Sequence, residues 1–263
     1  MICELSDQGL IKIQGNDAKK FLQGQLTCDA ERTISLGAHC NPQGRVLSLF
    51  YLFQYQDAYY LLMQQSMVPI ALSALMKYAV FFKITLTDDS KNWHVSGVIN
   101  DDVSLEQAVR IPVTESLYIL AGENNKIQAT HETNVWHQHR IKSGIPAIYP
   151  ETSGKFLPHE LNLPALDAVS FDKGCYTGQE IIARMHYRGK LKTHLYHVNI
   201  SSAHKPELAA DIYGEQGKAC GMVVDMAHDV YNNQYDLLIT ANGFDNKINI
   251  NNKIKDGIHV HKS

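Results

Sequence analysis

The sequence predicts an α+β protein made of more than one structural unit. Its 263 residues exceed the usual length of a single domain. Short apolar segments with the period of a β-strand alternate with segments of helical spacing. An apolar content of 44% with a net charge of −3 excludes an intrinsically disordered chain. We therefore expect a folded, mixed protein with room for more than one core.

The first part of the chain is predicted to form a strand, a helix and a hairpin. Residues 9–14 alternate in polarity and end in a Gly-Asn pair, which is typical of a strand followed by a turn. Residues 17–27 begin with an aspartate and carry apolar side chains at near-helical spacing, which predicts a helix. Residues 40–45 hold the Pro and Gly of a tight turn, so the apolar runs 46–53 and 59–63 are predicted as hairpin strands.

The middle of the chain is predicted to be a compact α+β insert. Residues 68–78 return to helical spacing, and residues 84–86 and 93–98 have strand patterns. Two aspartates open residues 101–110, where they can cap a short helix that ends near the arginine.

The last part of the chain is predicted to hold a helix, a long irregular stretch and a small β-domain. Residues 134–143 predict a helix closed by Gly144, with Pro146 just beyond it. Residues 150–170 are rich in turn residues and too long for a simple connector, which favours a functional surface. The strands predicted after that are residues 191–200, 217–224 and 235–240.

Composition sets limits on partners and on location. The 24 Lys and Arg residues nearly balance the 27 Asp and Glu residues, which argues against a protein that binds nucleic acid or membrane surfaces mainly by charge. No apolar run approaches the roughly 20 residues that a membrane span needs, and the N-terminal residues lack the pattern of a signal peptide. Five cysteines without a CxxC pair predict free thiols in a reducing compartment. We expect a cytoplasmic protein with no membrane partner.

Residues 171–189 are the segment most suggestive of chemistry. Thr177 and Glu180 have the spacing of a capping box, which predicts a helix that begins at about Gly178. Glu180, Arg184 and Arg188 would follow one another on one face of that helix.

Cys175 is the candidate reactive group of this segment. It precedes the predicted helix N-terminus, and Lys173 is two residues away, so both neighbours favour the thiolate. A free cysteine is also a common inert core residue, and charged pairs are common on solvated helix faces. Sequence position alone leaves these alternatives open.

The segment resembles the signature of the YgfZ family, folate-binding relatives of the glycine-cleavage aminomethyltransferase. The resemblance rests on the run KGCYTGQE at residues 173–180, followed by Ala183-Arg184 and Arg188-Gly189. Four other segments also resemble the family. They are residues 15–27 with the run FLQGQLT, the turn at 41–45, KYAVF at 77–81, and the Ser-Gly-x-Phe-x-Pro run at 153–158 with Asn162. The C-terminal third matches only loosely.

The resemblance implies a three-domain cloverleaf around a central tetrahydrofolate pocket. Residues 1–46 with 130–189 would form a discontinuous folate-binding domain. Residues 47–129 would form a ferredoxin-like domain, and residues 190–263 a C-terminal β-barrel.

The resemblance also implies an accessory function. Members support iron-sulfur enzymes, including those that methylthiolate tRNA, and the motif cysteine is central to that role. We therefore expect Cys175 and Lys173 to carry the chemistry, with tetrahydrofolate or a derivative as cofactor and iron-sulfur enzymes as partners. The family is not known for a defined turnover of its own.

A folate pocket needs an apolar slot for the pterin, a carboxylate for its N–H donors and a cation for its glutamate tail. The resemblance places Trp136 and Arg140 at that pocket and Glu151 near the position of a pterin-binding acid. Gln8 stands where some relatives have a second tryptophan. The resemblance adds three residues of the motif to the expected folate contacts, namely Tyr176, Glu180 and Arg184.

The rival class is a folate-dependent aminomethyltransferase or demethylase. Those enzymes resemble this fold but carry an acidic pair shortly after the glycine of the turn. Here Gly44 is followed by Arg-Val-Leu-Ser-Leu. No carboxylate is therefore available at these positions to stabilise charge at the reacting nitrogen. A third possibility is an interaction or RNA-binding module without folate.

Two further patterns are weak. A basic run could touch tRNA phosphates or form a solvated helix face, and its members are Arg184, His186, Arg188, Lys190, Lys192 and His194. His137 and His139 would point apart on a helix, so together with His131 they predict no shared metal site.

Overall fold

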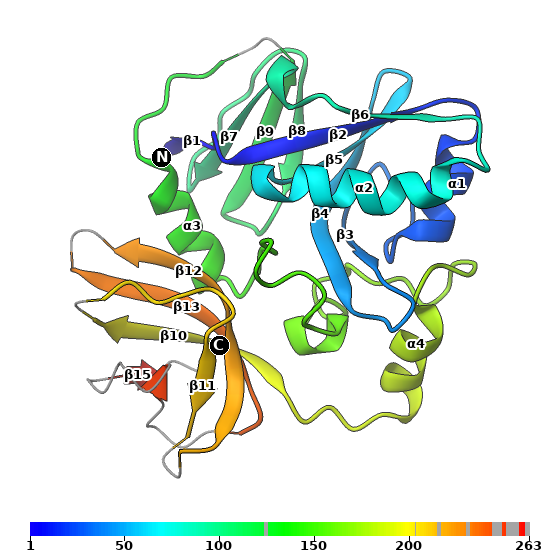
Figure 1. Cartoon of the computed structure of the whole chain (residues 1–263). Helices are drawn as coiled ribbons and strands as arrows, with labels where there is room; N and C mark the ends of the chain where they lie inside the picture. Colours follow the sequence, from blue (N-terminus) through cyan, green and yellow to red (C-terminus); the bar gives the residue numbers. More distant parts are fainter. Residues whose placement is uncertain are drawn as a thin grey trace.

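The computed structural model of the chain describes residues 1–123, 126–202, 204–214, 217–229, 232–243, 249–250 and 258–260. These residues form three antiparallel sheets and four α-helices (Figure 1). The first two sheets lie together in the upper part of the view, and the third lies below them on the left. The mixed, strand-rich character predicted from the sequence is confirmed.

The first sheet has the strand order β3-β4-β5-β2-β6. Its strands are β2 (Gln8–Gln14), β3 (Ile34–Cys40), β4 (Val46–Tyr55), β5 (Ala58–Gln64) and β6 (Thr85–Asp88). The helices α1 (Ala18–Gln25) and α2 (Val68–Ala79) connect strands of this sheet. The predicted first strand, helix and hairpin are confirmed. Their apolar faces meet in one core. The domain boundary expected after residue 46 falls within this sheet, at the start of β4.

The second sheet has the order β1-β7-β9-β8. Its strands are β1 (Ile2–Glu4), β7 (Trp93–Ile99), β8 (Ala108–Pro112) and β9 (Leu117–Glu123). The ferredoxin-like arrangement expected for the middle of the chain stays a prediction.

The helix predicted over residues 101–110 is wrong. Asp101 accepts a hydrogen bond from the N-terminal ammonium at 3.2 Å, and Asp102 pairs with Arg110 at 2.8 Å, so neither carboxylate caps a helix. The later residues form β8, in which Ile111 is buried opposite Ile119 of β9. Pairing with a neighbouring strand outweighed the local capping signal.

The third sheet has the order β14-β11-β12-β13-β10-β15. Its strands are β10 (His194–Ser201), β11 (Asp211–Tyr213), β12 (Ala219–Asp229), β13 (Gln234–Ala241), β14 (Asn249–Ile250) and β15 (Ile258–Val260). The three longest match the predicted strands. The expected barrel stays a prediction, and residues 244–248, 251–257 and 261–263 of that region lie outside the described residues.

The remaining helices join the sheets. They are α3 (Thr133–Lys142), α4 (Gln179–Arg188) and the short 3-10 helices η1 (Gln65–Met67), η2 (Ser90–Asn92) and η3 (Pro158–Leu161). Gly144 has a φ of +72°, a left-handed conformation that ends α3 as predicted. The helix α3 packs against β12 and β13, so it connects the third sheet to the rest of the molecule.

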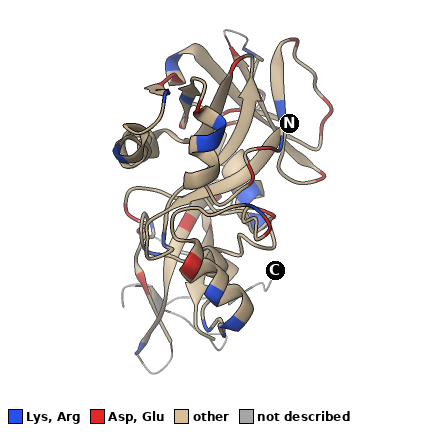
Figure 2. Cartoon of the chain, turned by 90° about the vertical axis from the view of Figure 1, so that its right-hand side faces the viewer, with Lys and Arg blue, Asp and Glu red and all other residues tan. Residues whose placement is uncertain are grey.

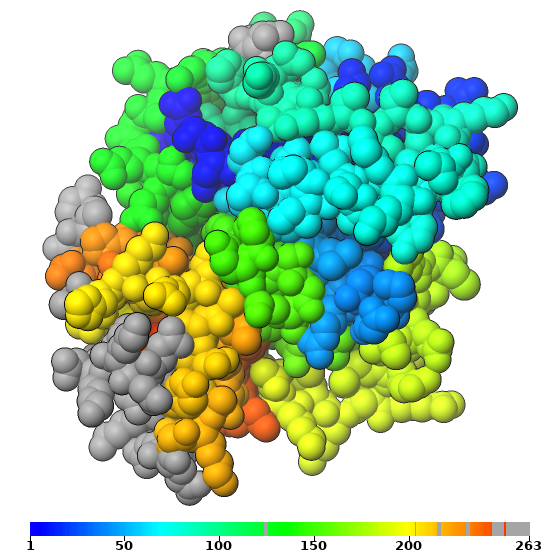
Figure 3. Space-filling view, in the orientation of Figure 1, coloured from blue at the N-terminus to red at the C-terminus, as the bar shows by residue number. Residues whose placement is uncertain are grey.

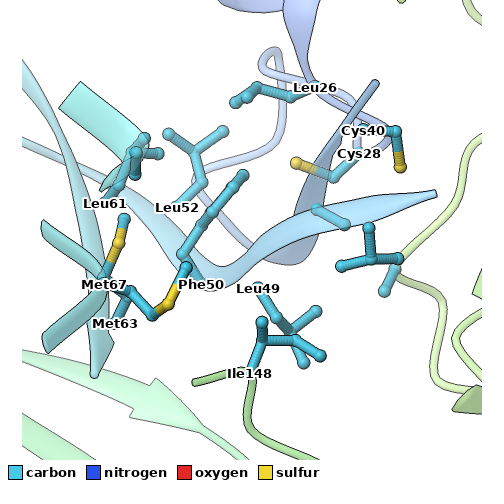
Figure 4. Packing of buried hydrophobic residues seen from close by; sticks show 14 of the residues in the cluster. Leu26, Cys28, Cys40, Leu49, Phe50, Leu52, Leu61, Met63, Met67 and Ile148 are labelled. Carbon is cyan, nitrogen blue, oxygen red and sulfur yellow. The ribbon is translucent and has the colours of Figure 1, made fainter. Parts of the chain in front are cut away.

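The largest core is shared by distant parts of the chain. Phe21 and Leu22 of α1 and Phe50 of β4 are buried in it together with Tyr176 and Ile182 of the cysteine motif. Figure 4 shows its centre, where Cys28 and Cys40 lie near Leu26 and face the strand that carries Phe50 and Leu52. The motif segment is therefore a part of the main core.

Positive and negative positions are mixed on the surface of the molecule. Figure 2 shows Lys and Arg positions interspersed with Asp and Glu positions over the face that it presents. Among the described residues no helix is both long and apolar enough to cross a bilayer.

Candidate functional site

The loop that carries Cys175, residues 173–178, is attached to the C-terminal end of α1. The Lys173 ammonium donates to the backbone carbonyls of Leu26 and Cys28 at 2.7 Å each and to that of Gln23 at 2.9 Å. It also donates to Oε1 of Gln23 at 3.1 Å. These carbonyls lie at or just beyond a helix C-terminus, where partial negative charge favours a cation. We call residues 173–178 the Cys175 loop.

Lys173 thus has an anchoring position that the sequence did not suggest. Its four acceptors belong to Gln23, Leu26 and Cys28, and its ammonium also lies 4.9 Å from the ring centre of Tyr176. Burial lowers the pKa of Lys173 to about 8. The predicted effect of Lys173 on the Cys175 thiol stays a prediction.

Thr177 fastens the other end of the loop. Its backbone N–H donates to the Gly24 carbonyl at 3.2 Å, and its hydroxyl lies 3.3 Å from Oε1 of Gln25. The predicted capping box is therefore wrong, because the Thr177 hydroxyl bonds to α1 and Glu180 pairs instead with Arg184. The predicted start of the helix is correct, since α4 begins directly after Gly178.

Two glycines let the turn at residues 41–45 approach the start of α4. Gly178 has a φ of +85°, and a Cβ placed on it would lie 2.6 Å from the Asn41 carbonyl oxygen and 3.0 Å from Cα of Gly44. Gly44 has a φ of +74°, and a Cβ placed on it would lie 3.1 Å from Cβ of Ile181. Three segments of the family resemblance therefore meet: the end of α1, this turn and the cysteine motif.

Cys175 is exposed between these two anchors. All five cysteines are described and free; Cys3, Cys28 and Cys40 are buried and Cys220 is half-buried. Burial raises the pKa of Cys28 and of Cys40 to about 12, which keeps both as thiols. Cys175 is the thiol that a reagent or partner protein can reach. Figure 3 shows the segment around α4 in yellow-green at the surface on the lower right, apart from the orange C-terminal strands.

A cavity beside Trp136 is the second part of the site. Its free space is about 40 Å³, which holds a few water molecules and is below the volume of a typical small-molecule pocket. Its apolar walls include Leu49, Met63, Ile119 and Trp136. Its polar lining comes from Gln8, Tyr51, Gln64 and Arg140. We call it the Trp136 cavity.

Trp136 is held rigidly at this cavity. It is 2% exposed, and a Cβ placed on Gly97 of β7 would lie 2.3 Å from Cε3 of its ring, so the indole packs directly on the strand backbone. The side chain is both a core residue and a wall of the cavity.

Arg140 serves the contact between α3 and the third sheet. Its guanidinium donates to Oδ2 of Asp225 and to the Ile145 carbonyl at 2.7 Å each. The same carboxylate accepts from the backbone N–H of Ala147 and, through Oδ1, from the Tyr149 hydroxyl. Asp225 is 0% exposed and has its oxygens fully engaged, so this buried pair is well compensated.

The Tyr51 hydroxyl is an unusual feature of the cavity. The oxygen is buried and has no hydrogen-bond partner. Burial raises the pKa of Tyr51 to about 12, so the phenol is protonated and free to donate a hydrogen bond. Buried polar groups are normally paired, and an unpaired one at a cavity wall marks a place where a ligand atom can bind.

These residues fit folate in two respects and differ in one. The apolar walls suit a flat ring, and Tyr51, Gln8 and Gln64 offer hydrogen bonds at its edge. The expected carboxylate is not there, because Glu151 is exposed and does not line the cavity. Amide oxygens of the glutamines are the acceptors available to pterin N–H groups.

The predicted site residues fall into two groups. Trp136 and Arg140 line the cavity, whereas Tyr176, Glu180 and Arg184 belong to the Cys175 loop and α4. Tyr176 is buried in the main core with an unpaired hydroxyl, and Glu180 and Arg184 form an exposed ion pair at 2.8 Å. Their predicted folate contacts stay predictions.

Sequence reasoning missed Tyr51, Gln64 and Asp225. Tyr51 and Gln64 lie in apolar strand segments that indicate burial and give no sign of a ligand. Asp225 lies in a strand pattern far from the motif, and its partners come from residues 140–149. The predicted strand stops at residue 224, one residue before Asp225. In the structure β12 continues through Asp225 and buries it, and a buried carboxylate requires a partner.

Known proteins give the family context. No protein-family model matches the chain. The chain is 32% identical over 257 residues to the tRNA-modifying protein YgfZ of Aliivibrio fischeri strain MJ11, covering 85% of this chain and 79% of that one. It is 32% identical over 247 residues to the tRNA-modifying protein YgfZ of Colwellia psychrerythraea, covering 82% and 76%. An uncharacterized protein of Haemophilus influenzae is 35% identical over 216 residues, covering 79% and 76%.

The fold has a counterpart among solved structures. It is similar to the crystal structure of the glycine cleavage system aminomethyltransferase T from Bartonella henselae, with a TM-score of 0.64 over 92% of this chain and 78% of that one. The sequence identity of that pair is 11%, so the likeness shows the fold alone. The aminomethyltransferase-like fold predicted from the sequence is confirmed at this level.

Proposed function

The chain belongs to the YgfZ family of tRNA-modifying proteins, and on that premise we propose that it is a tetrahydrofolate-binding accessory protein that supports iron-sulfur enzymes. The proposal assigns the ligand to the Trp136 cavity and the thiol role to Cys175. Its clients are iron-sulfur enzymes that modify tRNA, such as tRNA methylthiotransferases. Its place of action is the cytoplasm, together with those clients.

The observation that carries the proposal is a narrow cavity beside a buried tryptophan, with an unpaired hydrogen-bond donor in its wall. Trp136 supplies a rigid aromatic face, and the Tyr51 hydroxyl has no other partner. Gln8 and Gln64 are paired across β2 and β5 and line the same cavity. These residues would hold the pterin, and the bound tetrahydrofolate would supply one-carbon or reducing chemistry.

Cys175 suits an exchange with another protein. The thiol is exposed, while the loop on either side is fastened to α1 by Lys173 and Thr177. A fixed and accessible thiol can meet a client without rearrangement of the core. The same accessibility fits the role that the resemblance assigns to the motif cysteine.

A surface next to this loop suits tRNA. The six residues of the basic run, from Arg184 to His194, are all exposed. Tyr187 is 68% exposed among them, and Phe171 stacks on His186 with ring centres 3.8 Å apart. Cations for phosphates and aromatic rings for bases are the elements of a single-strand contact. We place tRNA here as a weakly held partner.

The aminomethyltransferase alternative receives no support from the turn. Ser48 and Leu49 occupy the positions after the glycine where those enzymes carry their acidic pair, and Ser48 is buried. Lys142, where that enzyme often has a glutamate, pairs with Asp236 at 3.3 Å. The groups that would stabilise developing charge on a reacting nitrogen are therefore missing from these positions.

Anaerobic calorimetric titration with tetrahydrofolate tests the ligand assignment. Saturable binding is expected for the wild-type protein, and Trp136→Phe should weaken it about tenfold through lost stacking area. Phe is preferred to Ala because Trp136 also packs on Gly97, and a large cavity would cost about 3–5 kcal/mol of stability.

The chain offers matched controls for this titration. Trp93→Phe changes the other tryptophan, which is also buried but does not line the cavity, and should leave the affinity unchanged. Cys175→Ala should likewise leave it unchanged. A folded wild-type protein that does not bind tetrahydrofolate would overturn the proposal, and the interaction-module alternative would replace it.

A further inference from the structure

The outward face of α2 is mainly apolar. Among the described residues five large apolar side chains are exposed, and four of them lie between residues 70 and 81. They are Ile70, Met76, Val80 and Phe81, and their exposed fractions rise from 36% to 81%. A surface helix normally turns polar side chains to solvent. Exposed apolar groups gathered on one element therefore indicate an interaction surface.

Helical geometry places these side chains on one stripe. With 3.6 residues per turn, one side of α2 and of the turn that directly follows it holds residues 69, 70, 73, 76, 77, 80 and 81. All seven are exposed, and we call them the α2 stripe. Val68, Ala71 and Leu75 on the opposite side are buried in the main core. The stripe is about 16 Å long, which matches three turns of another helix. Figure 3 shows this part of the chain in cyan across the upper half of the molecule.

The packing of this fold does not require the end of the stripe. Phe82 packs against Phe21 of α1, with ring centres 5.4 Å apart. Phe81, its neighbour in the chain, remains exposed. An exposed phenyl ring adds little to the apolar area that folding buries, so it contributes little to stability. Its apolar area is available for a partner.

Lysines surround the C-terminal end of the stripe. Lys77 belongs to it, and Lys83 follows it; the backbone N–H of Lys83 donates to the Asp17 carboxylate at 2.8 Å, which places α1 and its Lys20 beside the end of α2. All three lysines are exposed, and within the described part of the chain none of them has an ion-pair partner. The other lysine of α1 is compensated by Glu31 at 2.9 Å. Positive charge is therefore in excess at this end of the stripe.

Apolar groups beside unpaired cations favour an acidic helix of another protein as the occupant. The apolar face of such a helix can pack along the stripe, and carboxylates at its edge can pair with the lysines. A second copy of this chain is disfavoured, because it would bring the same lysines together. A membrane surface is also disfavoured, since recognition of anionic lipids uses clusters of about four to eight cations. The chain has three here and a net charge of −3.

We propose that the α2 stripe is the docking surface for a partner protein that presents an acidic, amphipathic helix of about three turns. Ile70, Met76 and Phe81 receive the apolar side chains of that helix. Lys77 and Lys83 pair with its carboxylates. No residue of the stripe lines the Trp136 cavity or belongs to the Cys175 loop, so the inference is independent of the ligand proposed for the cavity.

Fluorescence polarisation of labelled synthetic peptides with the full chain tests this surface. The probe is a peptide of about 18 residues, long enough to form a helix, with leucines on one face and glutamates on the other. It should bind saturably. A peptide with lysines in place of the glutamates should bind about tenfold more weakly, because its charge matches that of the stripe. A scrambled glutamate peptide should not bind, since it has no apolar face.

Variants of the chain locate the binding. Phe81→Ser should weaken the glutamate peptide about tenfold, as expected for a central apolar contact, and should leave folding intact because the side chain is exposed. Lys77→Glu should weaken it about fivefold and reduce its advantage over the lysine peptide. Tyr187→Ser and Lys218→Glu change exposed residues outside the stripe and should leave the affinity unchanged.

Four results would overturn the inference. The first is absence of binding by the glutamate peptide. The second is equal binding of the two charged peptides, or binding that Phe81→Ser does not change. The third is sedimentation of the protein with phosphatidylglycerol vesicles in place of peptide binding, which would assign the stripe to a membrane surface. The fourth is a dimer in sedimentation velocity that Phe81→Ser abolishes, which would assign the stripe to a second copy of the chain.

Discussion

The Trp136 cavity and the Cys175 loop differ in how the chain builds them. The cavity takes its walls from β2, the β4–β5 hairpin and α3, which are separate parts of the sequence, and its aromatic wall is 2% exposed. The loop is a short continuous segment whose thiol is exposed, whose hydrogen bonds reach the end of α1 and whose Tyr176 is buried in the main core. One region is assembled from several segments, and the other is a single segment held by hydrogen bonds and one buried ring.

The two regions therefore have separate structural supports. A change in the loop leaves the cavity walls in place, because no residue of the loop lines the cavity. The two regions are joined through the main core, to which Leu49, Phe50 and Tyr176 all belong. Substitutions can therefore be chosen to affect one region and spare the other.

Cys175→Ser should have the largest effect, and it should affect the Cys175 loop without affecting the Trp136 cavity. We expect loss of methylthio-modified tRNA in a strain that depends on this chain, with tetrahydrofolate affinity unchanged. The physical reason is that serine keeps the size and exposure of the side chain and removes the thiolate chemistry. Mass spectrometry of tRNA nucleosides and calorimetry provide the two readouts.

Cys220 supplies the matched control for that substitution. It is the other cysteine with some exposure and lies on β12, away from the loop. Cys220→Ser should keep tRNA modification at the wild-type level. Normal tRNA modification in the Cys175→Ser strain would show that the Cys175 thiol is not needed for the proposed function.

Lys173→Met should have a smaller effect, on stability. The substitution leaves the carbonyls of Gln23, Leu26 and Cys28 without their shared donor, and we expect the free energy of unfolding at neutral pH to fall by about 1–3 kcal/mol. Urea denaturation of both proteins measures this difference. Lys192→Met, at an exposed position, should change it by less than about 0.5 kcal/mol.

The effect of Lys173 should depend on pH in a defined direction. Burial lowers its pKa in the folded protein to about 8 from a usual value of 10.5, so the unfolded chain binds more protons between these values. The wild-type protein therefore gains stability relative to Lys173→Met as pH rises from about 8 to about 10.5. A difference that narrowed over this range would show that the lysine is not buried as described.

The fold was largely predictable because its elements have strong local patterns. Strands such as β2 and β5 bury alternate or continuous apolar residues, and α3 ends at Gly144 as its sequence indicates. The error at residues 101–110 shows the limit, since two adjacent aspartates suit a helix cap and also suit partners elsewhere. Asp101 pairs with the amino group of Met1 and Asp102 with Arg110. These pairings depend on tertiary structure, which the helix-capping pattern does not reveal.

Local patterns predicted some features of the candidate site. The motif predicted the start of α4, and the family resemblance named Trp136 and Arg140, which line the cavity. The partners of Lys173 could not be predicted, because they are backbone carbonyls and their number depends on how α1 ends. The partners of Asp225 come from α3 and the segment that follows it, which no spacing within one segment of the sequence reveals.

Glu180→Gln should have the smallest effect. It tests whether an ion pair within α4 adds to the contacts that hold the Cys175 loop on α1. Its ion pair with Arg184 is an i, i+4 contact with side chains 82% and 64% exposed, so we expect a loss of only about 0.3–0.5 kcal/mol in unfolding free energy. The loss should nearly vanish in high salt, because the pair is exposed and screened. Arg184→Gln and the double variant complete a cycle that isolates the pair. A coupling above about 1 kcal/mol would contradict a solvated pair. It would show that this face of α4 takes part in holding the Cys175 loop, which the observed contacts assign to Lys173 and Thr177 instead.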